Sequence, residues 1–128
     1  MSYRILIVDD SSVARKVVRR ALGMTGLAIV EMPEASGGIE ALEILRRDWI
    51  DLVVCDVHMP EMNGQELVEY MSADANLRTI PVIIVSSDTT DARRDSLLQA
   101  GAREYLHKPI TPERLRASAL RALYQEDA

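Results

Sequence analysis

The stretch of sequence that decides the fold is residues 3–12, which read YRILIVDDSS. A run of almost unbroken apolar character leads directly into Asp9, Asp10 and two serines. Such a run, without alternating polar residues, is typical of a strand that is buried on both faces of a parallel sheet. Polar residues after such a strand lie at its carboxyl end, where open α/β sheets bind ligands. The stretch therefore predicts a central strand that leads into a functional loop.

Shorter runs of the same kind recur along the chain, separated by segments with helical periodicity. The last helix is predicted to begin with Thr111 as its N-cap and Pro112 at its first position. The predicted strands are residues 3–8, 28–32, 52–55, 82–85 and 104–106. The predicted buried helix faces consist of Val13, Val17, Val18, Ala21 and Leu22; Ala41, Leu42 and Leu45; Leu67, Val68 and Met71; and Leu97 with Leu98.

This alternation of strands and helices indicates an α/β protein. Five βα units with short connections predict a doubly wound, five-stranded parallel sheet, because right-handed crossovers place helices on both faces. The length of 128 residues is that of one ordinary domain. The sequence contains no repeat, low-complexity tract or linker. We therefore expect a single domain over residues 1–128, with no room for an output domain.

The composition argues against several classes of protein. A formal net charge of -5, with arginines scattered in pairs, disfavours direct binding to nucleic acid. No apolar run approaches the roughly eighteen residues that a membrane-spanning helix needs, and the N-terminus shows no signal-peptide pattern. Cys55 is the only cysteine, so an intramolecular disulfide is excluded. We expect a cytoplasmic protein without membrane insertion.

Polar residues stand at the predicted carboxyl ends of four strands. Asp9 and Asp10 follow the first strand, Asp56 the third, Ser86 the fourth and Lys108 the fifth. Because these ends meet at one edge of a parallel sheet, we expect the five side chains to converge. Three carboxylates in one pocket repel one another unless a cation intervenes, and hard oxygen ligands of this number suit Mg²⁺. The sequence predicts a magnesium site.

This set of residues suits phosphoryl transfer. A carboxylate can attack phosphorus and form an aspartyl phosphate where cations neutralise the transferring group, and Mg²⁺ and Lys108 can supply that charge. The Ser86 hydroxyl can donate a hydrogen bond to a phosphoryl oxygen. Zinc is disfavoured, since Cys55 lies in a predicted strand and the two histidines, His58 and His107, show no ligand spacing.

The ordered set resembles the response regulator receiver domains of two-component systems. The resemblance is carried by Asp9-Asp10 after an apolar strand, the segment DVHMPEMNG over residues 56–64, Ser86 and the dipeptide Lys108-Pro109. Each feature is weak alone, whereas the complete set in this order is specific. The resemblance implies a flavodoxin-like fold with strand order 2-1-3-4-5.

The resemblance also implies the chemistry of the site. Asp56 would accept a phosphoryl group from a histidine kinase or a phosphotransfer protein. Asp9, Asp10 and Asp56 would hold Mg²⁺ together with the backbone carbonyl of His58. The protein would not be an enzyme in the usual sense, because it would catalyse only its own phosphorylation and dephosphorylation.

Further matching residues would transmit and tune the signal. Lys108 would pair with the carboxylate or phosphate, and its peptide bond to Pro109 is expected to be cis. Ser86 and Tyr105 match the switch pair that alters the face formed by the fourth helix, the fifth strand and the fifth helix, and so controls a downstream target protein. His58 and Asp88 match positions that tune dephosphorylation.

The run VDDSSVAR over residues 8–15 is similar to single-domain chemotaxis regulators. A phosphorelay intermediate is equally consistent with a bare receiver.

Three functions of other classes compete with the switch. A phosphatase with an aspartyl nucleophile would need an Asp-x-Asp pattern and a cap insertion. A nucleotide- or flavin-binding module would need a phosphate-binding loop where Asp9-Asp10 stands. A pseudo-receiver would serve only as an interaction module.

Overall fold

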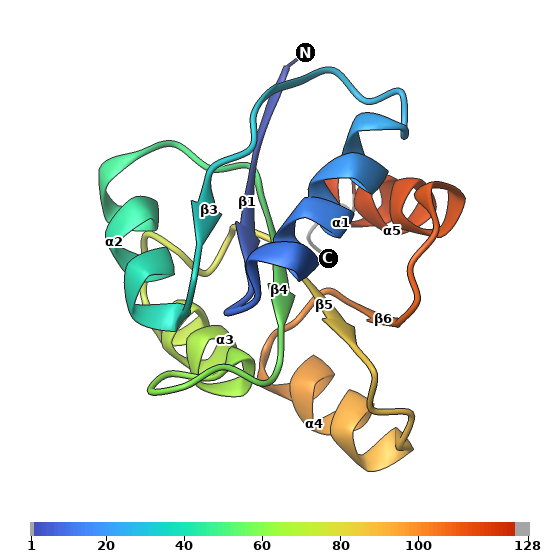
Figure 1. The fold of residues 1–128 in the computed structure, drawn as a ribbon. Helices are drawn as coiled ribbons and strands as arrows, with labels where there is room; N and C mark the ends of the chain where they lie inside the picture. The colour runs from blue at the N-terminus through green and yellow to red at the C-terminus, as the bar shows by residue number, and fades with distance from the viewer. Residues whose placement is uncertain (1, 125–128) are drawn as a thin grey trace.

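The computed structural model describes residues 2–124 and contains alternating strands and helices (Figure 1). The strands are β1 (Tyr3–Val8), β2 (Ile29–Glu31), β3 (Glu34–Ala35), β4 (Leu52–Asp56), β5 (Val82–Ser86) and β6 (Glu104–His107). The helices are α1 (Ser12–Gly23), α2 (Gly38–Arg47), α3 (Gly64–Ala73), α4 (Asp91–Ala100) and α5 (Pro112–Tyr124).

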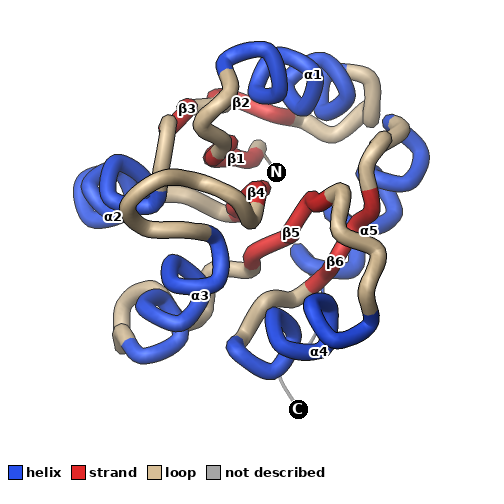
Figure 2. Tube along the Cα trace, turned by 60° about the horizontal axis from the view of Figure 1, so that its bottom comes forward, coloured by secondary structure: helices blue, strands red, loops and turns tan. Residues whose placement is uncertain are grey.

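A parallel sheet forms the middle of three layers. Its strands follow the order β2-β1-β4-β5-β6, and β3 also pairs with β1. Seen along the sheet in Figure 2, α1 and α5 cover one face, while α2, α3 and α4 cover the other. The predicted doubly wound sheet with order 2-1-3-4-5 is confirmed, with one additional short strand.

The apolar run in β1 serves two cores at once. Ile5 and Ile7 pack in the core beneath α1 and α5, whereas Leu6 and Val8 pack in the core beneath α2, α3 and α4. All four side chains are essentially inaccessible to solvent. Because successive side chains of a strand point to opposite faces, a strand covered on both sides is expected to be apolar at most positions. Each such side chain contributes about 1.5–3 kcal/mol through burial.

The second predicted strand, residues 28–32, was wrong in its extent. The structure divides this region into β2 and β3, which both pair with β1. Pro33 lies between them and has no N–H to donate, although its carbonyl accepts a hydrogen bond from Ile7 N at 2.9 Å. The strand lies at the sheet edge, so Val30 is exposed rather than buried. The short segment Glu34–Ala35 has no apolar run that would predict a strand.

The predicted helix faces are confirmed in most positions. The exceptions are Val13 and Val17, which are 69% and 53% exposed, and Leu98, which is also exposed. The buried face of α1 is therefore narrower than predicted and consists of Val18, Ala21 and Leu22. Thr111 caps α5 as predicted, accepting a hydrogen bond from Arg114 N at 3.2 Å. Among residues 2–124, every helix falls short of the length and apolar character that crossing a membrane requires.

Candidate metal centre

Three carboxylates converge at the carboxyl edge of the sheet. Asp9 and Asp10 follow β1, and Asp56 is the last residue of β4. Each can offer one carboxylate oxygen such that these oxygens all lie within 4.8 Å of one another. Asp9 and Asp56 are buried, with 4% and 8% of their surface exposed, whereas Asp10 is open to solvent. Two of the three acids are thus buried in the protein, and the third faces solvent.

Lys108 brings a positive charge to this cluster. Its Nζ lies 3.4 Å from Asp56 Oδ1 and 3.7 Å from Asp9 Oδ2. The residue follows β6, and its backbone N–H donates to the Ser86 carbonyl at 2.8 Å, which ties it to the end of β5. The Lys108–Pro109 peptide bond is cis. The ammonium therefore reaches the acidic cluster from a fixed backbone position.

Asp9 is the most restrained of the three acids. Its N–H donates to the Ala35 carbonyl at 3.1 Å, and its Oδ1 accepts from Ser11 N at 2.9 Å. Burial raises the pKa of the Asp9 carboxyl, the nearby Asp56 charge raises it further, and the Ser11 N–H and Lys108 act in the opposite direction. Crowded carboxylate oxygens are the donors that Mg²⁺ prefers, so these residues fit a magnesium ion.

Arg15 and Glu34 belong to the surroundings of the site although the sequence did not single them out. Arg15 Nη1 donates to the Asp9 carbonyl at 2.7 Å, and its Nε pairs with Glu34 Oε1 at 2.8 Å. A signal was available: an arginine stands in the first turn of α1, where the helix dipole favours an acidic residue. Nothing in the pattern identified Glu34 as its partner.

The loop between β4 and α3 needs a glycine at its end. Gly64 N donates to the Val57 carbonyl at 2.9 Å, which folds the loop back on itself. A β-carbon at Gly64 would lie 2.4 Å from the Asp56 carbonyl oxygen, closer than any contact allows. Within this loop, His58 is exposed and Met59 is buried. Gly64 thus lets α3 begin directly against the backbone of Asp56.

Asp88 links the predicted switch residues through its backbone. Its N–H donates to the Oγ of Ser86 at 3.0 Å, and its carbonyl accepts from the Tyr105 hydroxyl at 2.7 Å. Ser86 is fully buried. The Tyr105 ring packs edge-on against His107, which is partly buried. A single peptide segment therefore contacts both switch side chains.

The Asp88 carboxylate is occupied by the start of α4. It accepts from Thr90 N at 2.9 Å and from the Thr90 hydroxyl at 2.7 Å, and it lies 3.5 Å from Arg93 Nε. The Thr90 backbone N–H, its hydroxyl and Arg93 lower the pKa of the Asp88 carboxyl. Of the predicted site residues, Asp9, Asp10, Asp56 and Lys108 form one cluster, while the Asp88 side chain is engaged with α4.

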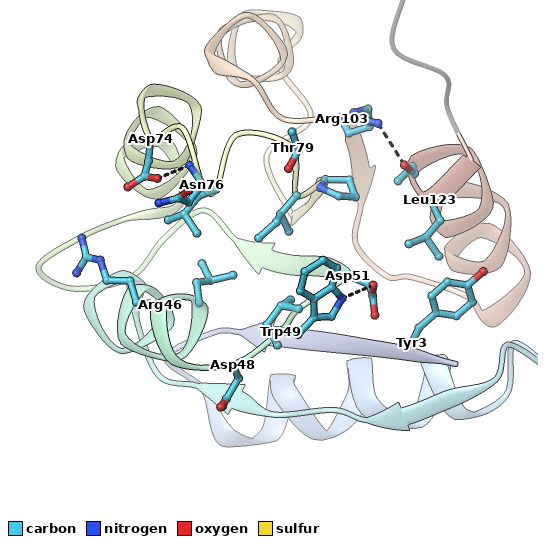
Figure 3. Close-up of a pocket in the computed structure, with 16 residues that line it drawn as sticks. Tyr3, Arg46, Asp48, Trp49, Asp51, Asp74, Asn76, Thr79, Arg103 and Leu123 are labelled. Carbon is cyan, nitrogen blue, oxygen red and sulfur yellow. Dashed lines mark hydrogen bonds between the residues drawn. The ribbon is translucent and has the colours of Figure 1, made fainter. Parts of the chain in front are cut away.

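A hollow lies at the opposite, amino-terminal edge of the sheet. Its volume is about 700 Å³, and Figure 3 shows Trp49, Asp51 and Arg103 among its lining residues. The Asp51 carboxylate accepts from Trp49 Nε1 and from the backbone of Arg4, both at 2.9 Å. This acid is thus used by the fold, and open α/β sheets bind ligands at the other edge. We therefore assign the functional site to the aspartate cluster.

Comparisons with known proteins agree with this geometry. The family model of the response regulator receiver domain matches residues 5–120. The chemotaxis protein CheY homolog of Campylobacter jejuni is 35% identical over 114 residues, which are 88% of this chain and 86% of that protein. Response regulator MprA of Mycobacterium bovis is 36% identical over 131 residues, a match that spans this whole chain but only 55% of that longer protein.

Solved structures give the same result. The chemotaxis response regulator CheY4 of Vibrio cholerae superposes with a TM-score of 0.84 at 29% identity. That superposition covers 96% of this chain and all of the other. The family model spans nearly every described element, and its relatives share the fold that carries the aspartate cluster. The chain therefore belongs to the response regulator receiver domain family.

Proposed function

We propose that this protein is a phosphorylation-activated switch in two-component signalling. In this proposal Asp56 accepts a phosphoryl group from a histidine kinase or a histidine phosphotransfer protein. The observation that carries the proposal is the Lys108 ammonium 3.4 Å from Asp56 Oδ1, within a cluster of three carboxylates that suits a divalent cation. A nucleophile and the cations that neutralise a transferring phosphoryl group would thus share one site.

The metal in this proposal is Mg²⁺. Asp9, Asp10 and Asp56 would hold it, together with the backbone carbonyl of His58. When bound, Mg²⁺ supplies positive charge to the phosphoryl oxygens and offsets the repulsion among the carboxylates. A bound cation would favour the charged form of the Asp9 carboxyl, whose pKa burial raises.

The transfer step uses residues of this chain. A carboxylate oxygen of Asp56 forms a bond to phosphorus while the bond between phosphorus and the donor histidine breaks. The released imidazole nitrogen keeps the electron pair of that bond and takes up a proton. Lys108 stabilises the developing negative charge on the phosphoryl oxygens, and the Ser86 hydroxyl donates a hydrogen bond to one of them.

The output of the switch would follow from the hydrogen bonds around Asp88. Ser86 Oγ accepts from the Asp88 backbone, so a hydroxyl drawn toward a phosphoryl oxygen would give up this contact. The Asp88 carbonyl holds Tyr105, so the ring would respond to the same movement. The face formed by α4, β6 and α5 would then change and bind a downstream target protein. His58 and Asp88 would set the rate of phosphate loss.

The cellular setting forms part of the proposal. Matches to chemotaxis proteins favour a chemotaxis-type regulator in the cytoplasm, acting through a protein partner rather than nucleic acid. The formal net charge of -5 supports this view, since it opposes contact with a phosphate backbone. The protein would turn over no external substrate as an enzyme. A phosphatase lacks an observation in its favour, and so does a pseudo-receiver.

The proposal is tested by incubating the protein with acetyl phosphate and Mg²⁺. We expect intact-mass measurement to find one phosphate, and borohydride trapping to locate it at Asp56. Borohydride should reduce the adduct, because an acyl phosphate has an activated carbonyl carbon that a serine phosphate ester lacks. Asp56→Asn should take up no phosphate. Label on Ser86 or Ser87, or label in the Asp56→Asn variant, would contradict the mechanism.

A further inference from the structure

Arg15 occupies an unusual position for a basic residue. It lies in the first turn of α1, where the helix dipole disfavours positive charge, and that turn contains no acidic residue. Its side chain is only 18% exposed, although arginine heads ordinarily remain in water. An arginine that is both unfavourable to the helix dipole and largely buried is expected to have a specific role in the folded protein.

The contacts of Arg15 indicate that task. Nη1 donates to the backbone carbonyl of Asp9 at 2.7 Å, and Nε donates to Glu34 Oε1 at 2.8 Å. Glu34 lies in β3 directly opposite Ile7 of β1. The planar guanidinium therefore joins α1, the end of β1 and the neighbouring strand through donors whose spacing is fixed.

The carbonyl that Arg15 holds belongs to the peptide bond between Asp9 and Asp10. A peptide bond is planar, so fixing its oxygen restricts the orientation of the Asp10 backbone that follows. Asp9 has three other restraints, at its N–H, at Oδ1 and at Oδ2. The Asp10 side chain is exposed and depends more on its backbone for its place in the cluster.

We propose that Arg15 is a positioning residue for the metal-binding turn: by clamping the Asp9 carbonyl against Glu34, it holds the Asp9 and Asp10 carboxylates ready for Mg²⁺. This inference rests on the proposed function, since it assigns a residue to the same site. Groups that orient metal ligands from outside typically contribute about 10–100-fold to metal affinity. We expect an effect of about tenfold, because Asp9 keeps its other restraints.

Arg19 provides a matched control on the same helix. It lies one turn further along α1 and also pairs with Glu34, at 3.2 Å. Its second contact is the Met32 carbonyl at 2.8 Å rather than the carbonyl of Asp9. Removing Arg19 therefore removes a similar charge and a similar ion pair but leaves the Asp9–Asp10 peptide clamped.

The experiment compares wild type, Arg15→Gln and Arg19→Gln. Mg²⁺ affinity is measured from amide chemical shifts of Asp10 and Asp56, and phosphorylation by acetyl phosphate is measured as a function of Mg²⁺ concentration. Arg15→Gln should raise the dissociation constant and the half-saturating Mg²⁺ concentration about tenfold. Its phosphorylation rate at saturating Mg²⁺ should equal that of wild type. Arg19→Gln should match wild type in both measurements.

Glu34→Gln keeps the Arg15 guanidinium but removes the charge of its ion-pair partner. This variant replaces Arg15→Gln in the experiment if Arg15→Gln fails to fold. It should weaken Mg²⁺ binding in the same direction and by less. Unchanged affinity in the Arg15 variant, or an equal loss in Arg19→Gln, would overturn the inference. So would a loss of rate that saturating Mg²⁺ does not restore. Wild type that binds Mg²⁺ but carries no phosphate on Asp56 would instead refute the proposed function.

Discussion

Tyr3 connects the first strand to the last helix through a hydrogen bond with the Tyr124 hydroxyl. This bond, burial, and the charges of Tyr124 and Asp51 raise the pKa of Tyr3 from 10.0 to about 12. The unfolded chain loses this proton at lower pH than the folded protein. The contribution to stability is therefore fully present below pH 10.0 and is lost as the pH rises toward about 12.

The free energy of unfolding of wild type should thus decline over this alkaline range more steeply than that of Tyr3→Phe. Denaturant unfolding at a series of pH values measures both slopes. Parallel curves for the two proteins would show that Tyr3 ionisation has no part in alkaline unfolding.

Individual site residues differ in how far the sequence predicted them. The convergence of Asp9, Asp10, Asp56 and Lys108 was predictable, because each stands at the carboxyl end of a strand and parallel strands end at one edge. The role of Arg15 was missed because its partners are a backbone carbonyl and a residue in another strand. Such contacts depend on the orientation of α1 against the sheet, for which local sequence has no periodic signal.

The loop between β4 and α3 acts as a unit that presents Asp56. Asn63 and Glu66 form a reciprocal capping box that begins α3, and Gly64 packs against the Asp56 carbonyl. Gly64→Ala should lower the free energy of unfolding by about 1–3 kcal/mol, because the new methyl group has no space. It should also slow phosphorylation by displacing Asp56. Chemical denaturation and acetyl phosphate kinetics measure the two effects.

Gly23→Ala is the control for this prediction. Gly23 ends α1, is exposed, and would place a β-carbon with no heavy atom within 4 Å. Alanine favours a helix over glycine by up to about 1 kcal/mol, so this variant should be as stable as wild type or more stable. Equal stability of the Gly64 and Gly23 variants would contradict the packing argument.

The limits of a strand were predictable from the sequence where both faces of the strand are buried. The inner strands β1, β4 and β5 are mostly apolar because helices cover both faces, and their limits were predicted to within a residue. The edge was harder. There Pro33 has no N–H to donate, and Val30 is exposed to solvent, so the apolar pattern no longer marks the extent of the strand. On α1, Val13 and Val17 follow the helical period but lie beyond the contact with the sheet.

Across the whole molecule, the proposed switch separates chemistry from signalling. Ser86→Ala should still accept phosphate, because the cations around Asp56 provide most of the charge neutralisation. It should transmit poorly, since the hydroxyl that discriminates between the two arrangements is missing. Amide chemical shifts of α4, Tyr105 and α5, compared between the phosphorylated or beryllofluoride-treated proteins, measure transmission. Shifts equal to those of wild type would refute the coupling.

The division of the edge strand into β2 and β3 also affects the tendency of the protein to aggregate. An exposed edge strand offers a row of free N–H and C=O groups on which another chain can assemble. Here the edge consists of two short strands, Ile29–Glu31 and Glu34–Ala35, with Pro33 between them, and each strand contains a glutamate. Two short pieces with a proline between them make a poor template for fibril growth. The division into β2 and β3, which made the edge strand hard to predict from the sequence, therefore protects this edge of the sheet from edge-to-edge aggregation.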